Sequence, residues 1–135
     1  MKQLIVLAFA ILSLNNIVKA QESKVQWVTI KSANLKCWEC KERLEKYLTI
    51  ENNTSMESGI VQWKINLLQG EIKFQFDPDR VNLSMLKAAL NNAGFDADSE
   101  LATEESYKLL PQACKRATEG GGPQPRKPCH LEPIH

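Results

Sequence analysis

The sequence is poor in several features that mark common protein classes. Only 7% of its 135 residues are aromatic, and histidine occurs twice, at His130 and His135. The formal net charge is +1 and the basic residues are not clustered, so electrostatics give no case for nucleic-acid binding. No nucleophile–base pair or carboxylate dyad stands out, so we do not expect an enzyme.

Long apolar runs are absent beyond the first twenty residues. After Lys2, residues 4–14 form a nearly unbroken apolar run, and Val18-Lys19-Ala20 places small residues just before Gln21. A run of this length is too short to span a bilayer, which needs ~20 apolar residues, and the layout is that of a cleaved secretory signal. We therefore expect residues 1–20 to be a signal peptide and the protein to be exported without stable membrane insertion.

Apolar periodicity predicts four strands and two helices. Residues of alternating polarity indicate strands, and apolar residues spaced three and four apart indicate amphipathic helices. The order β-α-β-β-α-β predicts an α+β, ferredoxin-like fold with a four-stranded antiparallel sheet and two helices on one face. The expected strands cover 25–32, 59–68, 71–76 and 95–98, and the expected helices 37–50 and 82–94.

The chain changes character after Asp98. Residues 99–110 could form a short helix, but four prolines and a Gly120-Gly121-Gly122 run follow Pro111. Such a composition cannot build a core, so we expect a disordered, flexible C-terminal tail. The predicted organisation is a signal peptide over 1–20, one domain over 21–98, and a short helix with a Pro/Gly-rich tail over 99–135.

The chemistry of the chain is concentrated in Cys37-Trp38-Glu39-Cys40, at the start of the first expected helix. Residues three apart lie on the same side of a helix, so both sulfurs can face one point. Free N–H groups and the positive end of the helix dipole should stabilise thiolates there, and Lys36 and Lys41 add positive potential. Two thiolates suit Cu(I) or Hg(II), whereas Zn(II) is a further candidate that would need additional ligands.

The domain resembles the heavy-metal-associated family, which includes copper chaperones, extensions of metal-pumping ATPases and periplasmic mercuric-ion-binding proteins. The resemblance lies in the strand-loop-CxxC-helix opening, the hairpin, Phe76-Asp77-Pro78 before the second helix, and Ala93-Gly94-Phe95-Asp96-Ala97 near the end. It implies the ferredoxin-like fold and metal binding through Cys37 and Cys40. It also implies a membrane metal transporter or metal ATPase as the partner.

The residues around the two cysteines are expected to support the site. The family's metal loop usually reads Gly-Met-x-Cys, and here it reads Asn34-Leu35-Lys36-Cys37. Leu35 can take the inward hydrophobic place of the methionine, and the resemblance places Phe95 beside the loop. Trp38 lies inside the motif, where it could contact a partner, shield the ion or pack on the start of the helix.

The tail holds other side chains that can bind metal, namely Cys114, Cys129, His130 and His135. They could complete a three- or four-ligand site, bind a second ion, close a Cys114–Cys129 disulfide, or be incidental. An even number of cysteines in an exported protein also favours disulfides, so Cys37 and Cys40 could be oxidised.

The resulting hypothesis is an exported, bacterial periplasmic, monomeric protein that scavenges or carries a soft metal ion. One alternative keeps the fold as a protein-interaction module with the CxxC cysteines oxidised. The other is a thiol–disulfide oxidoreductase. Thioredoxin-like chains usually have a tryptophan just before the first cysteine and a later cis-proline segment, and neither is evident here.

Overall fold

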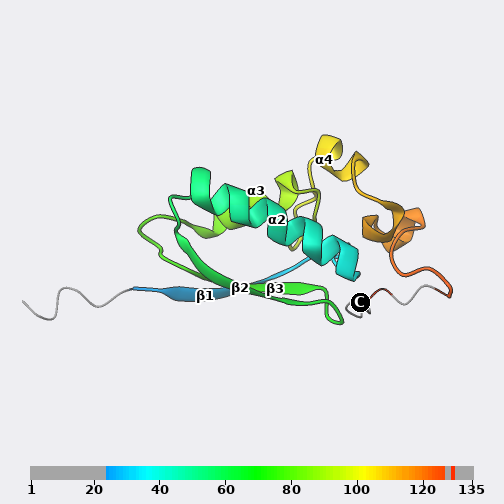
Figure 1. The fold of residues 1–135 in the computed structure, drawn as a ribbon, viewed down its shortest axis with the longest axis horizontal. Coiled ribbons are helices and arrows are strands. Elements are labelled where there is room, and N and C mark those ends of the chain that lie inside the picture. The colour runs from blue at the N-terminus through cyan, green and yellow to red at the C-terminus, as the bar shows by residue number, and fades with distance from the viewer. Residues whose placement is uncertain (1–23, 127–128, 130–135) are drawn as a thin grey trace, which may run out of the picture.

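The computed structural model describes residues 24–126 and 129. An antiparallel sheet in the order β1-β3-β2 forms one layer, and α2 and α3 cover one of its faces (Figure 1). The predicted signal peptide falls outside the described residues. Among the residues described, no helix is both long and apolar enough to cross a membrane.

The three strands follow the alternation in the sequence. They are β1 (Gln26–Lys31), β2 (Ile60–Asn66) and β3 (Glu71–Phe76), with β3 in the centre. Alternate residues of a strand point to one face, so β1 and β3 direct a row of apolar side chains toward the helices. The buried members of this row are Ile30, Ile72, Phe74 and Phe76.

The two helices present the apolar stripes that the sequence predicts. Helix α2 (Trp38–Thr54) continues four residues beyond the expected end at Ile50. Helix α3 (Leu83–Asn92) is capped by Asn82, whose side chain accepts a hydrogen bond from the Met85 N–H. The buried residues on the stripes are Cys40, Leu44 and Leu48 of α2 and Leu86, Ala89 and Leu90 of α3.

The predicted fourth strand is wrong in the described chain. Residues 95–98 do approach the free edge of β1, where the Asp98 N–H donates to the Lys31 carbonyl. Asp98 then has a φ of +53° and its carboxylate accepts the Lys31 N–H, while Ala97 pairs with Glu100 across a tight turn. A left-handed residue cannot continue a strand, so the pairing with β1 stops after one residue.

The short helix predicted within residues 99–110 is present as α4 (Glu104–Lys108). The flexible tail predicted after Pro111 differs from the structure over residues 112–126, which include two short 3-10 turns, η3 (Gln112–Cys114) and η4 (Ala117–Glu119). Tyr107, Leu110 and Cys114 are buried. Figure 1 shows the yellow-to-orange segment beside the N-terminal end of α2. The segment is held by polar and covalent contacts, which composition does not reveal.

Candidate functional site

Cys37 and Cys40 lie at the start of α2, as the sequence predicts. Cys37 is the N-cap residue, and its carbonyl accepts hydrogen bonds from the N–H groups of Cys40 and Lys41 at 3.0 and 3.1 Å. The two cysteines are therefore one helical turn apart. Both are completely buried.

Neither cysteine is a free thiol in this structure. Cys37 is bonded to Cys129 and Cys40 to Cys114, with Cα–Cα distances of 4.5 and 5.5 Å. The described residues contain no free cysteine, so the expected low-pKa thiolate pair is absent in this oxidised form. The alternatives of a Cys114–Cys129 disulfide and of a disulfide within the CxxC are both wrong for this structure.

In this form the described residues also contain no group of three or more His, Cys, Asp or Glu side chains that could hold a metal ion. The predicted accessory ligands Cys114 and Cys129 are brought to the CxxC, but as disulfide partners. His130 and His135 lie outside the described residues.

The residues predicted to surround the site are all buried or partly buried. Leu35 and Phe95 are completely buried. Trp38 is half-buried, donates from Nε1 to Glu42 at 2.9 Å, and has the Lys41 ammonium 4.3 Å from its ring centroid. The carbonyl of Lys36 faces the sulfur of Cys129 at 4.0 Å.

Asn34 is a central residue of the site whose contacts the sequence does not predict. Its side chain is 2% exposed and donates to the carbonyls of Gly94 and Cys114 at 3.0 and 2.9 Å. Its Oδ1 accepts the Asp96 N–H at 2.9 Å. One amide thus joins the metal loop, the end of α3 and the C-terminal segment. The departure from glycine at this position is the one sequence signal that could have pointed to it.

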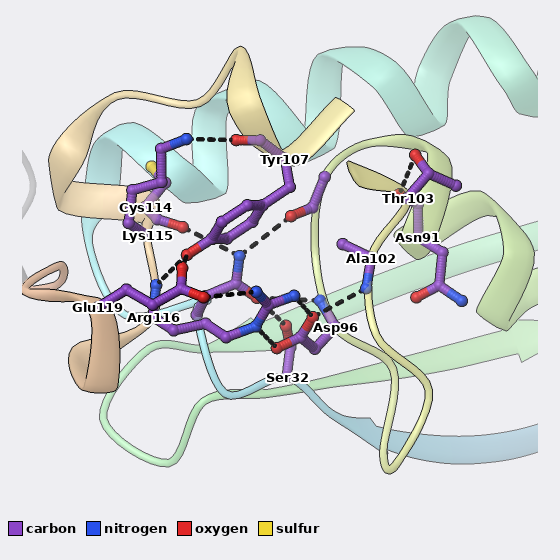
Figure 2. A network of polar contacts seen from close by, with 12 residues as sticks. Ser32, Asn91, Asp96, Ala102, Thr103, Tyr107, Cys114, Lys115, Arg116 and Glu119 are labelled. Atoms are coloured by element: carbon purple, nitrogen blue, oxygen red, sulfur yellow. Dashed lines mark hydrogen bonds and ion pairs between the residues drawn. The ribbon is translucent and has the colours of Figure 1, made fainter. Parts of the chain in front are cut away.

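A second polar connection joins Asp96 to Arg116 (Figure 2). Arg116 donates from Nε and Nη2 to the two carboxylate oxygens at 2.7 and 2.6 Å, and the Ala102 N–H donates to the same carboxylate at 2.9 Å. Burial alone would raise the pKa of Asp96, but the hydrogen bonds from Arg116 and Ala102 outweigh it and hold the pKa below its usual value. The same pairing raises the pKa of Arg116, so both groups are charged near neutral pH.

Tyr107 closes this network on the C-terminal side. Its hydroxyl accepts the Arg116 N–H at 2.8 Å and donates to Glu119, and the Arg116 guanidinium lies 4.1 Å from its ring centroid. Burial, followed by the hydrogen bond to Glu119, raises the pKa of Tyr107. The segment that carries Cys114 is therefore positioned on the domain by more than its disulfide.

Comparisons with known proteins identify structural neighbours. No protein-family model and no curated protein matches the chain. Oxidized MerP from Ralstonia metallidurans CH34 is 19% identical, with a TM-score of 0.47 over 55% of this chain and 94% of that one. The CopZ metallochaperone is 26% identical, with a TM-score of 0.45 over 53% of this chain and 98% of that one. A solution structure from Bacillus anthracis str. Ames is 21% identical, with a TM-score of 0.48 over 57% of this chain.

The likeness of these neighbours to this chain is partial. The alignments cover 53–57% of this chain, and their TM-scores are below 0.5. We therefore draw no conclusion about chemistry from them. What the cysteines can do has to be argued from this chain's own residues.

Proposed function

We propose that this chain binds a soft metal ion through Cys37 and Cys40 after both of its disulfides have been reduced. The observation that carries the proposal is the placement of the two cysteines, one as the N-cap and one in the first turn of α2. Reduction would leave two thiols, one turn apart, near the positive end of the helix dipole, which favours thiolate.

An ordinary dithiol reductant can supply the electrons and protons that reduce the two disulfides. Each disulfide accepts two electrons and two protons, and the reductant becomes a disulfide. The two thiols of the CxxC then release two protons to the solvent as their thiolates bind a monovalent or divalent soft ion. Cu(I) and Hg(II) accept two-coordinate sulfur ligation, so they are the ions that this pair alone suits best.

The cellular role follows from the expected signal peptide and the family resemblance. An exported monomer with such a site would scavenge the ion in the bacterial periplasm or carry it to a membrane metal transporter or metal ATPase. A dithiol can pass its ion to another dithiol by stepwise exchange of ligands.

The direct test is a Cu(I) titration under anaerobic conditions. We expect the reduced wild type to bind one equivalent tightly and the oxidised wild type to bind none. Cys37→Ser with Cys40→Ser should abolish binding, whereas the matched variant Cys114→Ser with Cys129→Ser should keep it. Equal binding by the reduced wild type and the Cys37→Ser, Cys40→Ser variant would overturn the proposal.

A second candidate is a protein-interaction module that works with all its cysteines oxidised. Both sulfurs of the CxxC are completely buried and bonded to the C-terminal segment, which favours this candidate in an oxidising compartment. It predicts that the reduced protein binds no Cu(I) in the same titration. No described feature favours the oxidoreductase alternative, since each CxxC cysteine is bonded to a cysteine outside the motif and no disulfide within the CxxC is present. Insulin reduction would test that alternative.

A further inference from the structure

The two disulfides join the C-terminal part of the chain to two cysteines at the start of α2. Cys37 and Cys40 are one turn apart on α2, and each lies within disulfide distance of a cysteine from the C-terminal segment. We propose that the fully reduced chain binds one tetrahedral divalent ion, Zn²⁺ or Cd²⁺, through the thiolates of Cys37, Cys40, Cys114 and Cys129. This inference rests on the proposed function, because it takes the reduced CxxC as half of the ligand set.

Contacts other than the disulfides keep the two C-terminal cysteines near the helix. The Asn34 side chain donates to the carbonyl of Cys114 at 2.9 Å, within a buried environment. The N–H of Trp38, at the first position of α2, donates to the carbonyl of Cys129. Each cysteine therefore has a backbone anchor that does not depend on its sulfur–sulfur bond.

The segment that carries Cys114 is also anchored at a distance from the sulfurs. Arg116 forms its two hydrogen bonds with Asp96, whose side chain is only 4% exposed. Leu110 is buried against Gly94, where a Cβ atom would meet the leucine side chain at 3.0 Å. Because these contacts contain no sulfur, reduction should leave Cys114 beside Cys40.

Four thiolates match the requirement of a structural zinc-type site. With Zn–S bonds of ~2.3 Å, a tetrahedral site places its sulfurs about 3.8 Å apart. Within each former disulfide, the two sulfurs need to separate only by about 2 Å to reach that spacing. Two thiolates alone leave Zn²⁺ short of ligands, and the C-terminal segment supplies the missing two.

The proposed site forms by reduction of the two disulfides followed by binding of the metal ion. Two dithiol reductants convert the two disulfides to four thiols and become disulfides themselves. The four thiols then release four protons as they bind one divalent ion as thiolates, so metal affinity should rise with pH. Lys36, Lys41 and Lys115 are sequence neighbours of the cysteines.

The experiment uses the reduced full chain, loaded with one equivalent of Zn²⁺ and studied by X-ray absorption spectroscopy. We expect a first shell of four sulfur atoms in the wild type. A shell of two sulfurs completed by oxygen or nitrogen would overturn the four-thiolate site, including a shell in which His130 or His135 takes part. The wild-type spectrum decides this without any variant.

Competition titrations with Cd²⁺ separate the inference from the proposed function. Cys114→Ser with Cys129→Ser should weaken Cd²⁺ binding by more than about 100-fold, since half the ligands are lost, while Cu(I) binding persists. Unchanged Cd²⁺ affinity in that variant contradicts the inference alone. Loss of Cu(I) binding by the reduced wild type would instead contradict the proposed function.

Discussion

The core and the C-terminal segment of this molecule are stabilised in different ways. The core, residues 25–98, places a continuous set of apolar side chains between the sheet and two helices. The C-terminal segment, residues 99–126 with Cys129, contributes three buried residues to that set and is otherwise held by Asn34, by the Asp96–Arg116 pair and by two disulfides.

The two regions therefore respond differently to reduction and to pH. Apolar packing is distributed over many residues and does not respond to redox conditions. Disulfides respond to reduction, and the Asp96–Arg116 pair responds to pH. The core can therefore remain folded while the disulfides that bond the C-terminal segment to Cys37 and Cys40 are reduced.

The largest loss of free energy of unfolding should come from a substitution in the core. Phe74→Ala removes a completely buried aromatic ring from the central strand, so we expect a loss of about 3–5 kcal/mol in the free energy of unfolding. Leu68→Ala is the control, because Leu68 is 82% exposed and should change stability by less than about 0.5 kcal/mol. Denaturant titration of the oxidised proteins measures both. Similar values for the two variants would contradict the assigned core.

Removal of the Cys40–Cys114 bond should lower the free energy of unfolding by less and should affect mainly the C-terminal segment. Cys40→Ala with Cys114→Ala should lower the free energy of unfolding by about 2–4 kcal/mol. Hydrogen exchange should accelerate mainly in residues 104–119, while the amides of β3 stay protected. Equal acceleration in β3 and in the C-terminal segment would remove the distinction between the two regions.

The smallest loss of free energy of unfolding should come from weakening the Asp96–Arg116 ion pair, which joins the two regions. Asp96→Asn should cost about 1–3 kcal/mol at neutral pH, because it weakens hydrogen bonds to a charged group. The pKa of Asp96 is lower in the folded chain than in the unfolded one, so its contribution is present above about pH 4 and is lost as the pH falls further.

Stability measured from pH 7 downward should therefore show the gap between wild type and Asp96→Asn closing in acid. Asp79→Asn makes the same chemical change at an exposed position and should shift stability by less than about 0.5 kcal/mol. A gap of constant size across the acid range would show that the carboxylate charge of Asp96 does not stabilise the fold.

Local patterns in the sequence predict most of the core. The alternation in β1 and β3, the Asn82 cap and Gly94, which has a φ of +101° at the end of α3, depend on neighbouring residues. The missing fourth strand depends on the left-handed Asp98, and no periodicity reveals that conformation.

The candidate site could be predicted only in part. The CxxC and its place on α2 follow from local sequence. The pairing does not, because four cysteines allow three connectivities and the observed bonds span 92 and 74 residues. Asp96 and Arg116 are likewise twenty positions apart, and nothing near either residue marks the other as its partner.

A disulfide map of the unreduced protein tests the central claim most directly. Digestion in mild acid with trypsin and a glutamate-specific protease cuts after Glu39 and so separates Cys37 from Cys40. Mass spectrometry should find the peptide of Cys37 joined to that of Cys129, and the peptide of Cys40 joined to that of Cys114. A Cys37–Cys40 bond together with a Cys114–Cys129 bond would contradict the account, because the C-terminal segment would then not cover the site.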